Sequence, residues 1–205
     1  MIDRVPRNLR RSLVISVLLL LSSGCIPIKT TYYESIDRPR VAAATQGNLL
    51  SCPPLYGYGV EFHDTTTEIG VDADPVGDRA RIDIVVPIRA PHKVTFQTLA
   101  VQLTSLSDPG ATSSAPITFY VHCNGGEEER KCPRVPAGVQ TLSGPATFSE
   151  PPAKYVGIVD VPAGMASGFV VILPDIYDGA SKPEAVPLRF RRRNGFLSRG
   201  EGGCQ

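Results

Sequence analysis

The chain has 205 residues, with 21 basic and 20 acidic side chains. Four arginines (Arg4, Arg7, Arg10 and Arg11) and one aspartate lie in the first 24 positions, so 17 basic and 19 acidic residues follow, a formal charge of −2. This balance argues against nucleic acid as a partner. Glycine and proline number 19 each, which favours many turns over long helices.

The first 25 residues have the parts of an export signal. The basic segment is followed by an apolar run, Leu13 to Leu21, and then by the small residues Ser22, Ser23 and Gly24 directly before Cys25. This pattern resembles the type II signal peptide of bacterial lipoproteins. The resemblance implies removal of residues 1–24 and lipidation of Cys25 with acyl chains such as palmitate. The alternative, a transmembrane helix, needs about 20 apolar residues, and this run is about half as long.

The residue after Cys25 is Ile26. An aspartate at this position retains many lipoproteins at the inner membrane, so the resemblance implies an outer-membrane protein with the membrane as its partner through the lipid. Residues 26–51 show little alternation and are expected, with Cys25, to form a flexible tether. Residues 52–205 are then expected to form one folded domain.

Short runs rich in Val and Ile, bounded by Pro, Gly, Asp or Asn, indicate strands throughout this domain. The predicted strands are Gly59–Phe62, Thr67–Val71, Ala80–Ile88, Val94–Leu106, Ile117–Cys123, Val139–Leu142, Tyr155–Val161, Phe169–Leu173 and Val186–Arg191.

Alternation along these runs predicts which side chains are buried. In Ala80–Ile88 the apolar residues at even positions share one face, opposite Arg81 and Asp83. In Val94–Leu106 the apolar set changes parity, which predicts a bulge near Gln97 and Thr98. Two antiparallel sheets packed face to face bury such faces, so we predict an all-β, disulfide-stapled β-sandwich, immunoglobulin-like or jelly-roll-like.

Four cysteines follow Cys25, and an even number in an exported protein indicates disulfides. Three pairings are possible, and the preferred one joins Cys123 to Cys132 and Cys52 to Cys204. The first bridge closes a loop with the acidic tip Glu127–Glu129, and the second ties the start of the domain to its end. The spacings lack the Cys-x-x-Cys pairs of zinc sites, so no metal is expected there.

The segment Asp72-Ala73-Asp74-Pro75-Val76-Gly77-Asp78 is a weak calcium candidate, because Asp72, Asp74 and Asp78 alternate around a glycine. Val76 and Pro75 depart from a calcium loop, and an ordinary surface turn between two strands is the preferred interpretation.

No catalytic residues are assigned. His122 next to Cys123 resembles a thiol–imidazole pair, but neighbouring strand residues point to opposite faces. His63 lacks a nearby nucleophile in the sequence, and His92 lies in the predicted turn Ala90-Pro91-His92-Lys93.

Arg189, Arg191 and Arg193 alternate near the end of the chain and are expected to share one face of a strand. Three guanidinium groups in a row suit phosphate or carboxylate groups, such as lipopolysaccharide phosphates or peptidoglycan carboxylates. A charged edge strand that discourages aggregation is the simpler interpretation.

Together these patterns predict a non-enzymatic lipoprotein of the outer membrane that needs no cofactor and serves as a binding or structural module of the cell envelope. Its partner is expected to be an envelope protein or glycan. Two alternatives stay open. One is an envelope hydrolase whose site is assembled from distant residues, such as His63 or His122 with a carboxylate. The other is an immunity or inhibitor lipoprotein whose charged Cys123–Cys132 loop caps a toxic hydrolase.

Overall fold

The computed structural model describes residues 26–36, 58–61, 67–123, 131–183 and 187–199. These ranges form β-strands joined by turns and loops, with a short 3₁₀ turn at Ala163–Met165. The strands are β1 (Ile26–Ser35), β2 (Tyr58–Glu61), β3 (Glu68–Val76), β4 (Arg79–Ile88), β5 (Lys93–Phe96), β6 (Ala100–Ser105), β7 (Thr112–Pro116), β8 (Thr118–Val121), β9 (Thr141–Ser143), β10 (Ala153–Val161), β11 (Gly168–Ile172), β12 (Ile176–Asp178) and β13 (Leu188–Arg199).

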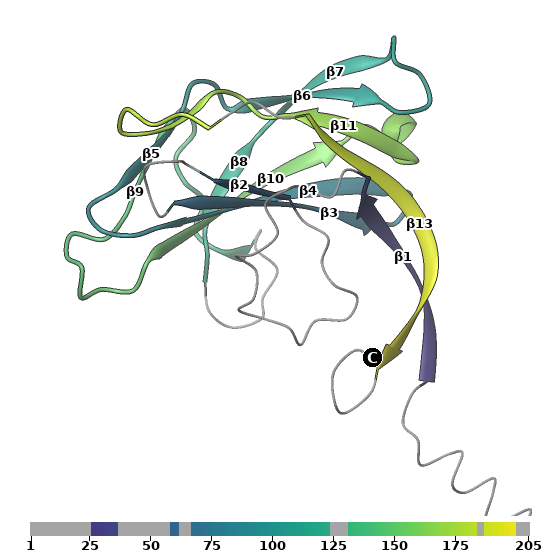
Figure 1. Cartoon of the computed structure of the whole chain (residues 1–205), viewed down its shortest axis with the longest axis horizontal. Helices are drawn as coiled ribbons and strands as arrows, with labels where there is room; N and C mark the ends of the chain where they lie inside the picture. Colours follow the sequence, from purple (N-terminus) through teal and green to yellow (C-terminus); the bar gives the residue numbers. More distant parts are fainter. Residues whose placement is uncertain (1–25, 37–57, 62–66, 124–130, 184–186, 200–205) are drawn as a thin grey trace, which may run out of the picture.

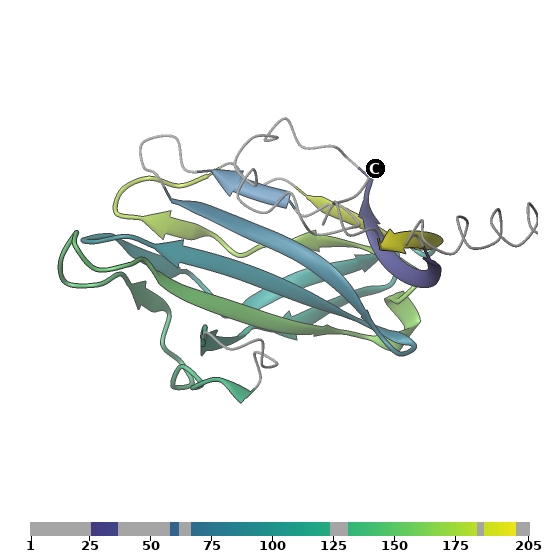
Figure 2. The same ribbon diagram turned by 90° about the horizontal axis from the view of Figure 1, so that it is seen from below.

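The strands form two five-stranded sheets and a small third sheet, and all pairs are antiparallel. Sheet A has the order β1-β13-β11-β6-β7, sheet B has the order β2-β3-β4-β10-β8, and sheet C has the order β12-β5-β9. In Figure 1, β6, β7 and β11 of sheet A lie above β3, β4 and β10 of sheet B, and Figure 2 shows the long strands of sheet B side by side. This confirms the predicted antiparallel β-sandwich.

The hydrophobic core lies between sheets A and B and takes its side chains from alternate strand positions. In β4, Ile82, Ile84 and Val86 are fully buried, while Arg81 and Asp83 point outward, as their alternation predicts. Sheet A contributes Phe169 and Phe190, whose ring centroids lie 5.6 Å apart. Burial of such apolar side chains stabilises the fold at roughly 25 cal/mol for each Å² removed from water.

A glycine in the middle of β10 makes room for this packing. A Cβ atom added at Gly157 would lie 2.7 Å from Cε1 of Phe119 and 2.8 Å from Cγ2 of Ile117. The Phe119 ring itself packs on Phe96 with centroids 4.9 Å apart. A glycine inside a strand often marks such a close approach by a neighbouring group.

The predicted strand Val94–Leu106 is two strands in different sheets. Residues 93–96 form β5 in sheet C, and residues 100–105 form β6 in sheet A. The expected bulge near Gln97 and Thr98 is therefore wrong. The parity of the buried residues changes because the chain leaves one sheet there and enters another, with the Gln97 N–H donating to the Asp175 carbonyl on the way.

Residues 26–35, expected to be part of a flexible tether, form β1. This strand pairs with β13 along its whole length, from Ile26 opposite Arg199 to Ser35 opposite Phe190. The tether prediction is wrong for this segment, because the hydrogen-bonding partner that makes it a strand lies more than 150 residues away in the sequence. The folded domain thus includes residues that precede the expected boundary at Cys52. Figure 1 shows the β1/β13 ribbon curving away at one end of the sandwich.

Other predicted strands are confirmed with shifted ends. The strand expected over Ile117–Cys123 is β8. Val121, expected to point inward, is 41% exposed; it lies opposite Tyr155 of β10, and its N–H donates to the carbonyl of Pro133. The strand Phe169–Leu173, expected to be central, is β11 in the middle of sheet A, although Ile172 on its outer side is 41% exposed. β7 and β12 are strands that the sequence patterns miss.

Candidate functional site

The arginines singled out in the sequence lie on the outward side of sheet A. Leu188 and Phe190 of β13 are buried, so Arg189, Arg191 and Arg193 alternate with them and are exposed on the opposite side. This confirms that the three share one face of a strand. Their role in binding stays a prediction.

The neighbours of these arginines are mostly uncharged. Arg189 lies opposite Val170 of β11, which in turn lies opposite Thr104 of β6. Across β6 and β7 the outward positions carry small polar side chains, namely Gln102, Thr104, Thr112 and Ser114. The carboxylate on the described part of this side is Glu34 of β1, whose Oε2 lies 2.8 Å from Nε of Arg193. We call this outward side of β1, β13, β11, β6 and β7 the arginine face.

Arg192 points to the other side of β13 and joins the two sheets. Its guanidinium donates hydrogen bonds to the carbonyl oxygen of Gly77, at 2.9 Å, and to that of Asp78, at 3.4 Å. Both residues form the turn between β3 and β4. Arg192 is therefore a structural contact and does not belong to the arginine face.

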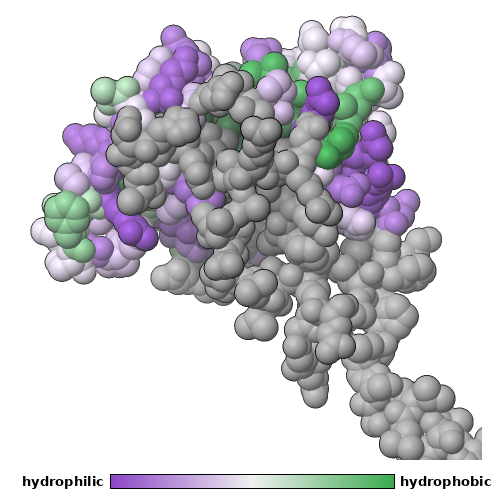
Figure 3. Space-filling model, in the orientation of Figure 1, coloured by the Kyte–Doolittle hydropathy of each residue, from purple (hydrophilic) through white to green (hydrophobic). Residues whose placement is uncertain are grey.

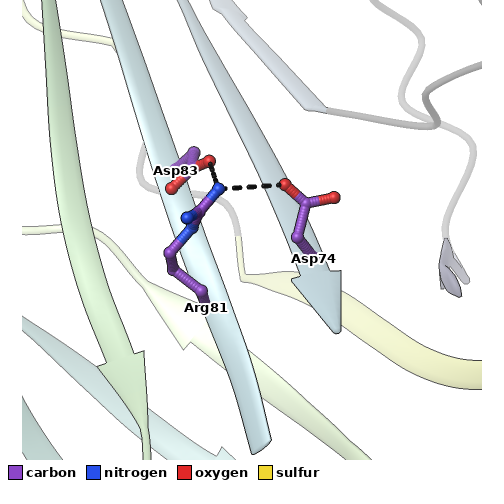
Figure 4. Close-up of polar contacts among 3 residues, drawn as sticks. All are labelled: Asp74, Arg81 and Asp83. Carbon is purple, nitrogen blue, oxygen red and sulfur yellow. Dashed lines mark hydrogen bonds and ion pairs between the residues drawn. The ribbon is translucent and has the colours of Figure 1, made fainter. Parts of the chain in front are cut away.

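A cluster of carboxylates lies on the outward side of sheet B. Cross-strand pairing places Asp74 opposite Arg81 and Arg81 opposite Asp160, and it places Asp72 opposite Asp83. Figure 4 shows Arg81 between two of these carboxylates, with its Nη2 2.8 Å from Asp83 and 3.5 Å from Asp74. Burial alone would lower the pKa of Arg81, but Asp83 and Asp74 outweigh it and the pKa is raised.

The pKa of Asp72 in this cluster is strongly shifted. Burial, followed by the negative charges of Asp74 and Asp83, raises the pKa of Asp72 from 3.8 to about 6. Like charges directly opposite each other on neighbouring strands are unfavourable, which is the relation between Asp72 and Asp83. We call the outward side of β3, β4, β10 and β8 the acidic face, and its acidic residues are Glu68, Asp72, Asp74, Asp83 and Asp160.

The structure does not form the loop that the calcium hypothesis requires. Asp72 and Asp74 belong to the extended strand β3, and Asp78 lies beyond its end in the exposed turn. The guanidinium of Arg81 is the cation beside Asp74. Within the described ranges, no group of three or more His, Cys, Asp or Glu residues is arranged to hold a metal ion.

A histidine and a buried carboxylate meet at the end of the sandwich formed by sheet C. Asp178 of β12 is 4% exposed; one of its oxygens accepts a hydrogen bond from the Thr67 hydroxyl at 2.5 Å, and the other lies 3.2 Å from Nδ1 of His92. Sequence reasoning placed His92 correctly in a turn but missed this partner, because the two residues are 86 positions apart. A buried carboxylate that contacts Nδ1 fixes the orientation of an imidazole ring.

The other histidines and cysteines are distributed as follows. Cys123 and Cys132 form the predicted disulfide, with Cα atoms 5.7 Å apart. His122 precedes it, and its backbone N–H donates to the carbonyl of Lys154. Cys25, Cys52, Cys204, His63 and Glu127–Glu129 lie outside the described residues.

Two shallow depressions adjoin β8. The first, about 180 Å³, lies on the acidic face and is lined by Pro116, Thr118, Tyr120, Ile158 and Asp160. The second, about 160 Å³, lies between β8 and the segment 134–139. Both are smaller than the roughly 300 Å³ at which sites for drug-sized ligands begin. The coloured part of the surface in Figure 3 is mostly polar with scattered apolar patches.

Comparison with known proteins does not identify a relative. The chain matches no family model, no curated protein and no solved structure. Over the part of the chain that the structure describes, no helix is both long and apolar enough to cross a membrane.

Proposed function

We propose that this chain is an outer-membrane lipoprotein, anchored through Cys25, whose β-sandwich is a non-enzymatic binding or structural module of the cell envelope. The observation that carries the proposal is the order of features at the N-terminus. A basic segment, an apolar run and small residues lead to Cys25, and β1 of the sandwich begins at the next residue. Acyl chains on Cys25 would therefore hold the domain close to the lipid surface.

The distribution of polar residues supports binding through a surface. The arginine face and the acidic face each extend over several strands, and the depressions between side chains are small. Charged and polar side chains spread over several strands suit an extended partner, such as an envelope protein or glycan, better than a small substrate that needs an enclosed site. The proposed partner class is therefore macromolecular.

Intact mass spectrometry of the protein purified from membranes tests the anchor. A mass that begins at Cys25 and includes acyl chains is expected, and replacement of Cys25 by Ser should abolish the acylation. An unacylated wild-type protein in the soluble periplasmic fraction would overturn the proposal. Non-reduced and reduced samples of the same preparation also test the predicted Cys52–Cys204 bridge.

An envelope hydrolase is the second candidate, and the contact between His92 and Asp178 is the observation that favours it. A histidine with a buried carboxylate on its Nδ1 supplies two of the three members of a Ser-His-Asp arrangement. A fluorophosphonate probe, which labels activated serines, separates the two functions. Labelling of the wild type that disappears in His92→Gln would favour the enzyme, and no labelling of either protein would favour the binding module.

A further inference from the structure

The two outward faces of the sandwich carry opposite charge. On the described side chains of the arginine face, three arginines stand against Glu34. On those of the acidic face, the five carboxylates stand against Arg79, Arg81 and Lys154. The domain therefore has a positive side and a negative side, and an external charged surface would orient it.

The proposed anchor, Cys25, directly precedes β1 in the sequence, and β1 pairs with the strand that carries the arginines. Arg193 is opposite Tyr32 and Arg191 is opposite Glu34. A strand rises about 3.3 Å per residue, so Tyr32 lies at most about 23 Å along β1 from Cys25. An acyl group on Cys25 would keep these guanidinium groups within reach of the lipid headgroups when the β1/β13 ribbon lies along the membrane.

We propose that the arginine face docks on the lipid phosphates of the membrane that holds Cys25, and that the acidic face is turned away from that membrane. This inference rests on the proposed function, because the anchor on Cys25 supplies the membrane. Guanidinium groups bind phosphate oxygens through paired hydrogen bonds. The net negative charge that the five carboxylates leave after Arg79, Arg81 and Lys154 are counted would be repelled by the same phosphates, so one orientation is selected.

The uncharged part of the arginine face fits the same contact. Gln102, Thr104 and Ser114 offer hydrogen bonds to headgroups without charge repulsion. Val170 and Ile172, between them and β13, add apolar area, and Ile172 is 41% exposed. Each arginine near an anionic surface strengthens binding by about fivefold, an effect that salt screens over about 8 Å at physiological ionic strength.

Arginine footprinting of the full lipidated protein tests the orientation. The protein is reconstituted in vesicles of phosphatidylcholine, with or without phosphatidylglycerol, treated with phenylglyoxal and analysed by peptide mass spectrometry. We expect the modification rates of Arg189 and Arg191 to fall several-fold in the anionic vesicles, with recovery in high salt. Arg79, exposed on the acidic face, is the internal control and should react equally in both.

Two matched double variants remove the same charge from opposite faces. With Arg189→Gln/Arg191→Gln, protection of the remaining Arg193 in anionic vesicles should be lost. With Arg79→Gln/Lys154→Gln, it should persist. The side chains replaced in both variants are exposed, and circular dichroism checks that each variant is folded.

Three results would overturn the inference. The first is that Arg189 and Arg191 are modified at equal rates in both kinds of vesicle, and the second is that Arg79 is protected as strongly as they are. The third is that inorganic phosphate without vesicles protects Arg189 and Arg191 as strongly as anionic vesicles do, which would indicate a free-anion site. Flotation of the vesicles tests independently whether the protein is anchored to them. Protein that does not float contradicts the proposed function, whereas protein that floats without protection of the arginines contradicts this inference alone.

Discussion

Replacing Asp72 with asparagine should stabilise the protein at neutral pH and remove part of the pH dependence of its unfolding. Asp72 lies on β3 opposite Asp83 and near Asp74. Burial, followed by the charges of these two carboxylates, raises the pKa of Asp72 from 3.8 to about 6. Asparagine has nearly the same shape but no charge, so it removes both the desolvation of the carboxylate and the repulsion.

The sign of the effect follows from the direction of the shift. Below pH 3.8 the carboxyl of Asp72 is protonated in the folded and unfolded chains, and its contribution to stability is fully present. As the pH rises, the unfolded chain releases this proton first, so the contribution is lost progressively until the folded carboxyl ionises at about 6. The rise of this pKa from 3.8 to about 6 corresponds to a loss of up to about 3 kcal/mol above that pH.

Urea unfolding followed by far-ultraviolet circular dichroism measures this effect, since the chain has no tryptophan. Wild type and Asp72→Asn should be similarly stable near pH 4. Near pH 7.5 the variant should be more stable by about 1 to 3 kcal/mol. Because other groups also titrate in this range, the informative quantity is the difference between the two proteins at each pH.

Asp78→Asn is the matched control, because Asp78 lies in the exposed turn after the same strand. The control variant should differ from the wild type by less than about 0.5 kcal/mol at both pH values. The reasoning would be refuted if Asp72→Asn differed from the wild type by the same amount at pH 4 and pH 7.5, or if it were the less stable protein at pH 7.5.

Two further perturbations test the packing and the disulfide. Gly157→Ala should lower the free energy of unfolding by about 1 to 3 kcal/mol, because its methyl group would meet the Phe119 ring. Gly164→Ala is the control, because no neighbouring atom lies within 4 Å of its new Cβ, and it should be nearly neutral. Thermal unfolding of both variants measures the difference. Equal effects of the two would contradict the close packing at Gly157. Replacing both Cys123 and Cys132 by serine opens a loop with a sequence separation of 9. The free energy of unfolding, measured in urea, should fall by about 2 to 3 kcal/mol. Unchanged stability would mean that the bridge does not constrain the unfolded chain.

Much of the fold was predictable because local alternation reports burial directly. Every second residue of β4 is apolar, so its buried face could be assigned without knowing its neighbours. The same logic placed Arg189 and Arg191 together on the outward side of β13. β1 was missed because Ile26–Ser35 shows no such alternation and becomes a strand by pairing with β13, near the other end of the chain.

The candidate sites depend on relations between strands that no local pattern contains. Alternation placed Asp83 on an outward face, but only the register of β3 against β4 puts Asp72 opposite it and raises the pKa of Asp72. His92 and Asp178 meet because β5 and β12 are neighbours in sheet C.

Local patterns along the chain thus predict the all-β class, the buried face of β4 and the shared face of the three arginines, and they favour the Cys123–Cys132 bridge among three possible pairings. That the arginines and the carboxylates occupy opposite sides of the domain follows from the order of the strands in sheets A and B. The physical reason is that side-chain alternation depends on one strand alone, whereas the charge of a face is the sum over strands brought together by long-range hydrogen bonding.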